Sequence, residues 1–170
     1  MKNKKGFTLV ELLAVIVILA LIMGIAVVSI GSVLQSSKKK IMFENAQSIL
    51  NGVKKQLLIN NDTPNASGTT YYGFNSGLLD SGGVESPLGG NFAYRTFNSS
   101  NDSKINDGST AVLWKIGGTA PSSCAANVES YVSYNATSGE YSICLTAGAG
   151  NNYIDGTEAN VTAQADSALK

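Results

Sequence analysis

A long apolar stretch near the start of the chain limits what this sequence can fold into. From Leu12 to Val28 every residue is apolar or glycine, and with two serines included the stretch continues to Leu34. A helix needs about 20 such residues to cross the hydrocarbon core of a bilayer. We therefore predict a transmembrane helix over residues 12–34.

Glu11 places a carboxylate directly before this stretch. An ionised side chain at the centre of a bilayer costs about 2.5–3.5 kcal/mol, so the position needs a partner or a purpose. One explanation is a capping box, with Thr8 capping a helix and Glu11 returning a hydrogen bond. That interpretation explains Glu11, but it explains neither Gly6 nor the length of the apolar stretch.

A second pattern follows the apolar stretch and predicts an amphipathic helix. Apolar residues recur at steps of 4, 3, 4 and 4 at Met42, Ala46, Ile49, Val53 and Leu57, with polar residues on the other faces. No proline interrupts the chain before residue 60, where Asn60–Pro64 supplies a stop signal. We predict one helix over residues 7–59, whose stripe packs on a domain of the same chain.

The rest of the chain is predicted to form a connecting loop over residues 60–90 and a globular β-sheet head over 91–170. The head has four candidate strands, at Phe92–Phe97, Ala111–Gly117, Glu129–Tyr134 and Glu140–Thr146. A five-residue hairpin loop, Asn135–Gly139, joins the last two strands. The predicted fold class is therefore α+β, a small antiparallel sheet packed on the helical stripe.

Charge is divided along the chain although the net charge is zero. Residues 1–59 hold eight lysines and two glutamates, whereas residues 60–170 hold four basic and ten acidic side chains. Lys38–Lys40 directly follow the apolar stretch and fit a solvated collar at the membrane surface. The head has no cluster of basic residues, so we predict no direct binding of nucleic acid.

Cys124 and Cys144 are the two cysteines of the chain. On the far side of a membrane an even pair usually forms a disulfide. In the loop-entropy model such a bond would add about 3 kcal/mol of stability. Two free buried thiols are the alternative.

Composition argues against an enzyme. The chain has no histidine, which excludes His-based triads and His-ligated zinc, and it has no phosphate-binding loop motif. The acid-rich segments Asn101–Gly108 and Asn151–Glu158 fit either calcium binding or turns. Neither segment has the spacing of an EF-hand, so we favour turns and predict no catalytic residue, metal or cofactor.

The segment Lys5-Gly6-Phe7-Thr8-Leu9-Val10-Glu11 resembles the cleavage and methylation motif of type IV prepilins. The resemblance implies that residues 1–6 are a leader removed by prepilin peptidase after Gly6. It implies that Phe7 becomes the N-methylated N-terminus, and that Glu11 neutralises the Phe7 amine of an adjacent subunit during assembly. The long helix followed by a small sheet is similar to the pilin fold, in which a C-terminal disulfide is common.

The resemblance further implies a structural subunit of a type IV pilus that supports adhesion, motility or DNA uptake. The implied partners are other pilin subunits, the peptidase, an assembly ATPase and a membrane platform protein. Before assembly the chain would span the cytoplasmic membrane once, and afterwards it would lie in an extracellular pilus. The leader and the composition are similar to those of Gram-positive chains.

Other functions remain open from the sequence. The chain could be a pseudopilin of a type II secretion or competence system. It could be a minor, ligand-binding tip pilin, which an exposed aromatic patch around Tyr71, Tyr72 and Phe74 would favour. A signal-anchored ectodomain with an enzymatic role is a further alternative, and a cleaved secretory signal peptide is disfavoured because the apolar core exceeds the usual 7–15 residues.

Overall fold

A long N-terminal helix dominates the computed structural model, which describes residues 8–78, 86–87, 91–105, 111–126, 128–147 and 153–170, apart from the side chains of 26–29. This helix, α1 (Leu9–Ile59), matches the predicted helix closely. The chain divides into two compact units, Met1–Ser37 and Lys38–Lys170. The second unit therefore contains the C-terminal part of α1 together with the whole sheet.

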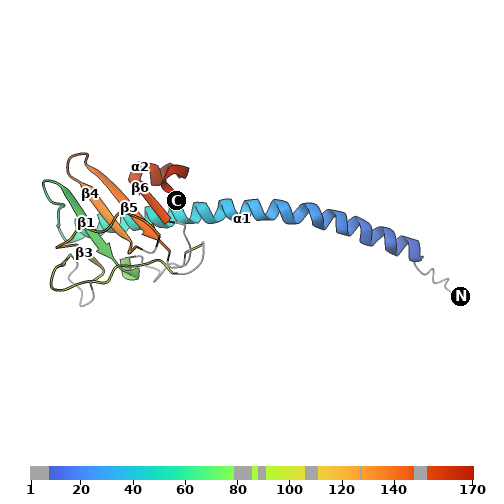
Figure 1. The fold of residues 1–170 in the computed structure, drawn as a ribbon, viewed down its shortest axis with the longest axis horizontal. Coiled ribbons are helices and arrows are strands. Elements are labelled where there is room, and N and C mark those ends of the chain that lie inside the picture. Colours follow the sequence, from blue (N-terminus) through green and yellow to red (C-terminus); the bar gives the residue numbers. More distant parts are fainter. Residues whose placement is uncertain (1–7, 79–85, 88–90, 106–110, 127, 148–152) are drawn as a thin grey trace. The chain divides into compact units, whose positions relative to one another are not determined.

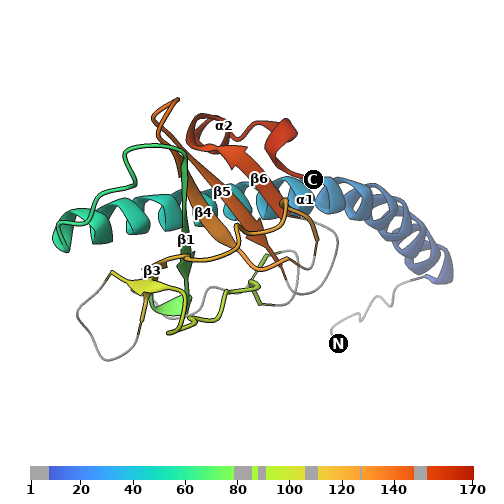
Figure 2. The same cartoon turned by 60° about the vertical axis from the view of Figure 1, so that its left-hand side comes forward.

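The amphipathic part of α1 buries the stripe that its periodicity predicts. Met42, Ala46, Ile49 and Val53 are completely buried and Leu57 is nearly so. Phe43 and Leu50 widen the stripe, since both are also buried. Figures 1 and 2 show this part of the helix running across one face of the sheet, which covers the stripe.

The sheet has six antiparallel strands in the order β2-β3-β1-β4-β5-β6. Their bounds are β1 (Thr69–Phe74), β2 (Ser103–Lys104), β3 (Leu113–Lys115), β4 (Tyr131–Asn135), β5 (Glu140–Thr146) and β6 (Tyr153–Thr157). The strands add a set of buried side chains to the helical stripe: Tyr72, Phe74, Leu113, Val132, Ile143, Leu145 and Ile154. The predicted α+β class is confirmed.

The hairpin between β4 and β5 forms where it was predicted. Asn135 pairs with Glu140, and the Gly139 N–H donates to the Asn135 carbonyl at 2.8 Å. Gly139 has φ of +72°, a conformation that glycine adopts without the steric cost of a Cβ. The Asn135 side chain also accepts from the Thr137 N–H at 2.8 Å, which fixes the turn.

Two predictions about strands are wrong. The segment 60–90 is not simply a connecting loop, because it contains β1, which pairs with both β3 and β4 near the middle of the sheet. Conversely, Phe92–Phe97 does not form a strand. Phe92 and Tyr94 make only isolated bridges, to Ala147 and Ser130 respectively.

The C-terminal residues cover the β6 edge of the sheet, an arrangement that was not predicted. After β6 the chain forms a short helix, α2 (Glu158–Thr162), whose N-cap Thr157 accepts from the Asn160 N–H. It then returns so that Leu169 bridges Ile154, and Lys170 exchanges two backbone hydrogen bonds with Tyr153 at 2.9 and 3.2 Å. The outer side of β6 is therefore paired at its beginning.

Candidate functional site

The start of α1 carries the capping box that the sequence suggested. The Glu11 N–H donates to the Thr8 hydroxyl oxygen at 3.3 Å. In return, Oε2 of Glu11 accepts from the Thr8 N–H at 2.8 Å and from the Thr8 hydroxyl at 3.0 Å. A carboxylate offers about four acceptor positions, so these two bonds leave capacity for a further donor.

The two predicted processing residues precede the capping box in the sequence. Gly6 and Phe7 lie outside the described residues. The pairing of Glu11 with a Phe7 amine therefore stays a prediction. Glu11 itself is placed at the first turn of α1, where a negative charge interacts favourably with the helix dipole.

The apolar half of α1 exposes its side chains. Every large apolar residue from Leu9 to Leu34 whose side chain is described is at least 49% exposed. Soluble monomers rarely expose an apolar surface of this extent, so the segment needs a lipid or protein partner. In length and hydropathy α1 also meets the requirements for crossing a membrane.

Gly24 and Gly31 interrupt this apolar surface at positions that face open space among the described residues. A Cβ added at either position would have no atom within 4 Å outside its own helical backbone and chain neighbours. Packing inside the described chain therefore does not explain the two glycines. Their presence is typical of membrane helices, where glycine is more frequent than in soluble ones.

The lysine collar, Lys38–Lys40, follows the apolar segment and belongs to the second unit. All three residues are exposed. Lys39 lies 3.8 Å from Asp166, and Lys40 lies 3.9 Å from Glu44. Exposed pairs at such distances contribute little stability and exchange easily.

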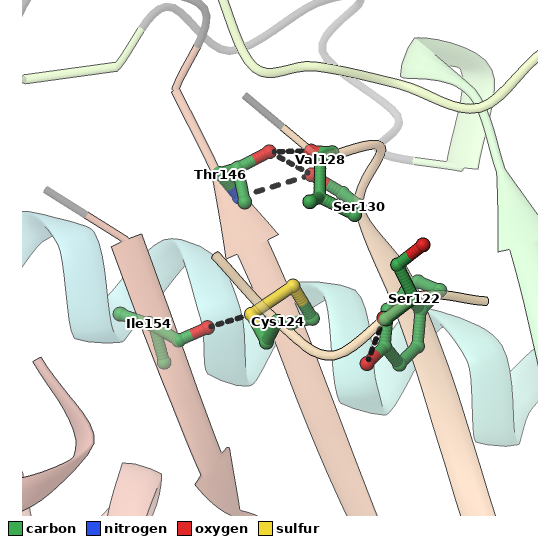
Figure 3. Close-up of a disulfide and its surroundings, with 8 residues drawn as sticks. Ser122, Cys124, Val128, Ser130, Thr146 and Ile154 are labelled. Atoms are coloured by element: carbon green, nitrogen blue, oxygen red, sulfur yellow. Dashed lines mark hydrogen bonds between the residues drawn. A yellow bond between two sulfur atoms is a disulfide. The ribbon is translucent and has the colours of Figure 1, made fainter. Parts of the chain in front are cut away.

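The two cysteines form a disulfide, as the sequence predicted (Figure 3). Cys144 lies on β5 and is 1% exposed, while Cys124 comes from the segment before β4 and its Sγ lies 3.6 Å from the Ile154 carbonyl oxygen. The bond ties that segment to β5, the strand next to the β6 edge of the sheet. The Tyr131 hydroxyl adds a second tie by donating to the Ser122 carbonyl at 3.3 Å.

A buried pair of hydroxyl groups lies beside the disulfide in Figure 3. The Ser130 hydroxyl oxygen accepts from the Thr146 N–H at 3.1 Å, and the Thr146 hydroxyl donates to the Val128 carbonyl. Both side chains are fully buried. These bonds satisfy both hydroxyl groups. The pair therefore holds the end of β5 to the start of β4 rather than forming a reactive site.

The described residues contain no group of three His, Cys, Asp or Glu side chains close enough to hold a metal ion. Asp102, in the first acid-rich segment, is 8% exposed and accepts from the backbone N–H groups of Asn98 at 3.0 Å and Gly117 at 3.1 Å. This use of a carboxylate is typical of a turn. Part of each acid-rich segment lies outside the described residues.

The aromatic residues of β1 do not form an exposed patch. Tyr72 and Phe74 are completely buried, and Tyr71 is half-buried against the Tyr131 ring. The observation that would have favoured a ligand-binding tip subunit is therefore absent from this strand.

Lys54, Tyr141 and Glu158 form a polar cluster on the head that was not predicted. Lys54 Nζ lies 2.5 Å from both carboxylate oxygens of Glu158 and 5.0 Å from the centre of the Tyr141 ring. Burial, reinforced by the nearby charges of Tyr134 and Glu158, raises the pKa of the Tyr141 hydroxyl. Lys54 and Glu158 are 104 residues apart, so no local motif could have indicated their contact.

Comparison with known proteins places a recognised motif on the start of the chain. Residues 1–34 match the family model for the prokaryotic N-terminal methylation motif. No curated protein and no solved structure matches the chain. The matched range contains Gly6, Phe7, the capping box and the apolar segment up to Leu34.

Proposed function

From the signature of type IV prepilins that residues 1–34 carry, we propose that this chain is a structural subunit of a type IV pilus. Proteins with this motif are structural rather than enzymatic, and the motif implies polymerisation and a peptidase that processes the precursor. The observation that carries the proposal is the apolar half of α1. It exposes large apolar side chains from Leu9 to Leu34 and has a carboxylate at its first turn.

The apolar surface suits a protein with two successive environments. In the cytoplasmic membrane the segment contacts lipid, and in a filament it contacts the same segment of other copies. Because lipid tails and neighbouring helices are both apolar, the exchange has a small net free energy. An assembly ATPase and a membrane platform protein would therefore set the direction of the exchange.

Glu11 would act during assembly. After cleavage at Gly6, the new amine of Phe7 is a cation, and a cation near a carboxylate in apolar surroundings is strongly stabilised by pairing. The capping box leaves acceptor capacity on Glu11 for such a donor. We propose that Glu11 binds the N-methylated Phe7 amine of an adjacent subunit and so sets the axial register of the filament.

The second candidate is a pseudopilin of a type II secretion or competence system. It shares the motif and the helix, so the same geometry supports it. Abundance and length separate the two functions: a pilus subunit forms long surface filaments, whereas a pseudopilin forms a short assembly.

The test is the intact mass and N-terminal peptide of protein sheared from cells. A chain that starts at N-methylated Phe7 and is recovered in long filaments supports the proposal, and the matched variant Gly6→Val should leave the leader attached and abolish filaments. Mature protein recovered only in short assemblies would favour the pseudopilin. A wild-type chain that still starts at Met1, or starts near Ser32, would instead identify a signal anchor or a secreted protein.

A further inference from the structure

A hollow of about 490 Å³ opens on the head beside the hairpin end of β5. Its walls include Glu140 and Tyr141 from β5, and Glu158, Ala159 and Ala163 from α2 and the residue after it. Figure 2 shows α2 beside this end of the hairpin. Carboxylates, an aromatic ring and small apolar side chains together suit a basic side chain, whose alkyl part packs on apolar atoms while its charge meets the acids.

Two residues that line this hollow, Tyr141 and Glu158, already contact one ammonium group. Lys54 from α1 is bound to Glu158 and lies over the Tyr141 ring, at the distances given above. This internal contact compensates the charge of Glu158. No salt bridge in the described part of the chain involves Glu140, which is exposed and lines the same hollow.

We propose that this hollow receives a side chain of the lysine collar, Lys38–Lys40, from a second copy of the chain. Residues 60–170 carry a net charge of −6, and residues 7–59, which remain after removal of the leader, hold five lysines and two glutamates for a net side-chain charge of +3, so the basic side chains of one copy complement the acidic head of another. The collar is available because its two pairs within the chain are long and exposed, with side-chain exposures of 51% for Lys39 and 64% for Lys40.

The position of the collar on α1 predicts how the two copies are offset. Lys39 and Lys54 are fifteen residues apart, which corresponds to about 22 Å along the axis of a helix. Lys54 contacts Tyr141 and Glu158, which line the hollow, whereas the collar of the same chain lies further along α1, where Lys39 is beside Asp166. A parallel copy displaced by about 22 Å along α1 would bring its own collar level with the hollow.

This contact rests on the proposed function, because polymerisation through the apolar segment is what would hold the copies parallel. It adds a second, polar contact on the heads to the apolar contact of the helices. The contact would contribute to the offset between subunits and make the filament sensitive to salt.

A zero-length carbodiimide tests the contact directly on sheared filaments. The reagent joins an amine and a carboxylate only when they touch, and within one chain Lys39 lies beside Asp166 and Lys40 beside Glu44, whereas Glu158 pairs with Lys54. We expect mass spectrometry to find Glu140 or Glu158 joined to Lys38, Lys39 or Lys40. Lys54 joined to Glu158 within one chain serves as the internal positive control.

Charge reversal gives an independent readout. Glu140→Lys should weaken the association between subunits by about two- to fivefold, as expected for one exposed ion pair, and so lower the NaCl concentration that disperses half of the filaments. Asp155→Lys makes the same charge change at an exposed residue of β6 that pairs with Cys144 and does not line the hollow, and it should leave that concentration unchanged. Combining Glu140→Lys with Lys38→Glu, Lys39→Glu or Lys40→Glu should restore the wild-type value in at least one case.

The outcomes separate this contact from the proposed function. Filaments of mature protein that show only the Lys54–Glu158 link, with Glu140→Lys and Asp155→Lys behaving alike, would overturn the contact alone. A chain that forms no filaments and still starts at Met1 would overturn the proposed function, and the contact with it.

Discussion

The indole of Trp114 fills the space that a side chain at Gly73 would occupy. The two residues are partners across β1 and β3, and a Cβ at position 73 would lie 2.2 Å from Trp114 Nε1. Trp114 is 1% exposed and packs edge-on against Phe97, with ring centroids 5.6 Å apart. Glycine at position 73 is therefore a packing requirement of the head.

Gly73→Ala should destabilise the head by about 1–3 kcal/mol, because the indole must shift within a packed site. Trp114 is the only tryptophan of the chain, so its fluorescence during urea unfolding in detergent reports on this site. Gly31→Ala is the matched control, since its Cβ would meet nothing within 4 Å. Equal unfolding midpoints for the two variants would contradict this account.

Tyr72→Phe should stabilise the head at neutral pH by about 1 kcal/mol. The Tyr72 ring is completely buried, and its hydroxyl has no hydrogen-bond partner among the described residues. Burying a hydroxyl without a partner is unfavourable, and phenylalanine keeps the ring without that group. The free energy of urea unfolding of the full chain in detergent measures the change, and a loss of stability would show that the hydroxyl has an unseen partner.

Alkaline pH should destabilise the head, and Tyr72 should contribute strongly. Burial raises the pKa of the Tyr72 hydroxyl above the value of 10.0 that it has in the unfolded chain, and the pKa values of Tyr131 and Tyr141 also rise. The stabilisation is complete below pH 10 and is lost as the pH rises above it, because the unfolded chain then releases protons that the folded chain retains. Unfolding midpoints between pH 8 and 11 should fall less steeply for Tyr72→Phe than for wild type.

Removing the disulfide with Cys124→Ala and Cys144→Ala should cost about 3 kcal/mol, because the bond closes a loop of about 20 residues in the unfolded chain. Urea unfolding of the double variant should match that of the wild type in reductant. Adding reductant to the double variant should change nothing. A loss below about 1 kcal/mol would mean that the unfolded chain is already constrained in this region.

Thr8→Ala should loosen the first turn of α1, whereas Thr8→Ser should preserve it. The Thr8 hydroxyl both accepts from the Glu11 N–H and donates to its carboxylate, and alanine can do neither. Loss of such a cap costs about 1 kcal/mol, which corresponds to about fivefold faster hydrogen exchange of the Glu11 amide. The measurement is made by NMR in detergent micelles, and equal exchange rates in the two variants would rule out the cap as the stabilising contact.

Repeating patterns decided which elements could be predicted. The stripe on α1 repeats every three or four residues over a long helix, so each buried position supports the others. In β5 the alternation of Tyr141, Ile143 and Leu145 gave the bounds of the strand as the structure has them, Glu140–Thr146. The local pattern was sufficient to predict both elements, although the buried stripe is wider than predicted because it also includes Phe43 and Leu50.

Short strands and distant contacts were beyond the sequence. β2 has two residues, which is too short for an alternating pattern, and β1 is flanked by the Gly, Ser, Asn and Thr residues that usually indicate loops. By contrast, β3 lies within the predicted strand Ala111–Gly117, although it is shorter than predicted. Phe92–Phe97 has strand-forming residues but lacks a continuous partner strand. At the start of α1, Thr8 and Glu11 were predictable because their contact is local, whereas Lys54 and Glu158 meet only through the folded head.

The backbone pairing of Lys170 with Tyr153 bears on how this protein avoids aggregation. An open strand edge is a template on which strands of other molecules can add and grow into fibrils. At the start of β6 that template is already occupied by the chain itself. Before heads could stack in a disordered way on this side, the C-terminal residues would have to detach from β6. Ordered growth through the apolar half of α1 requires no such step, so it is the easier route.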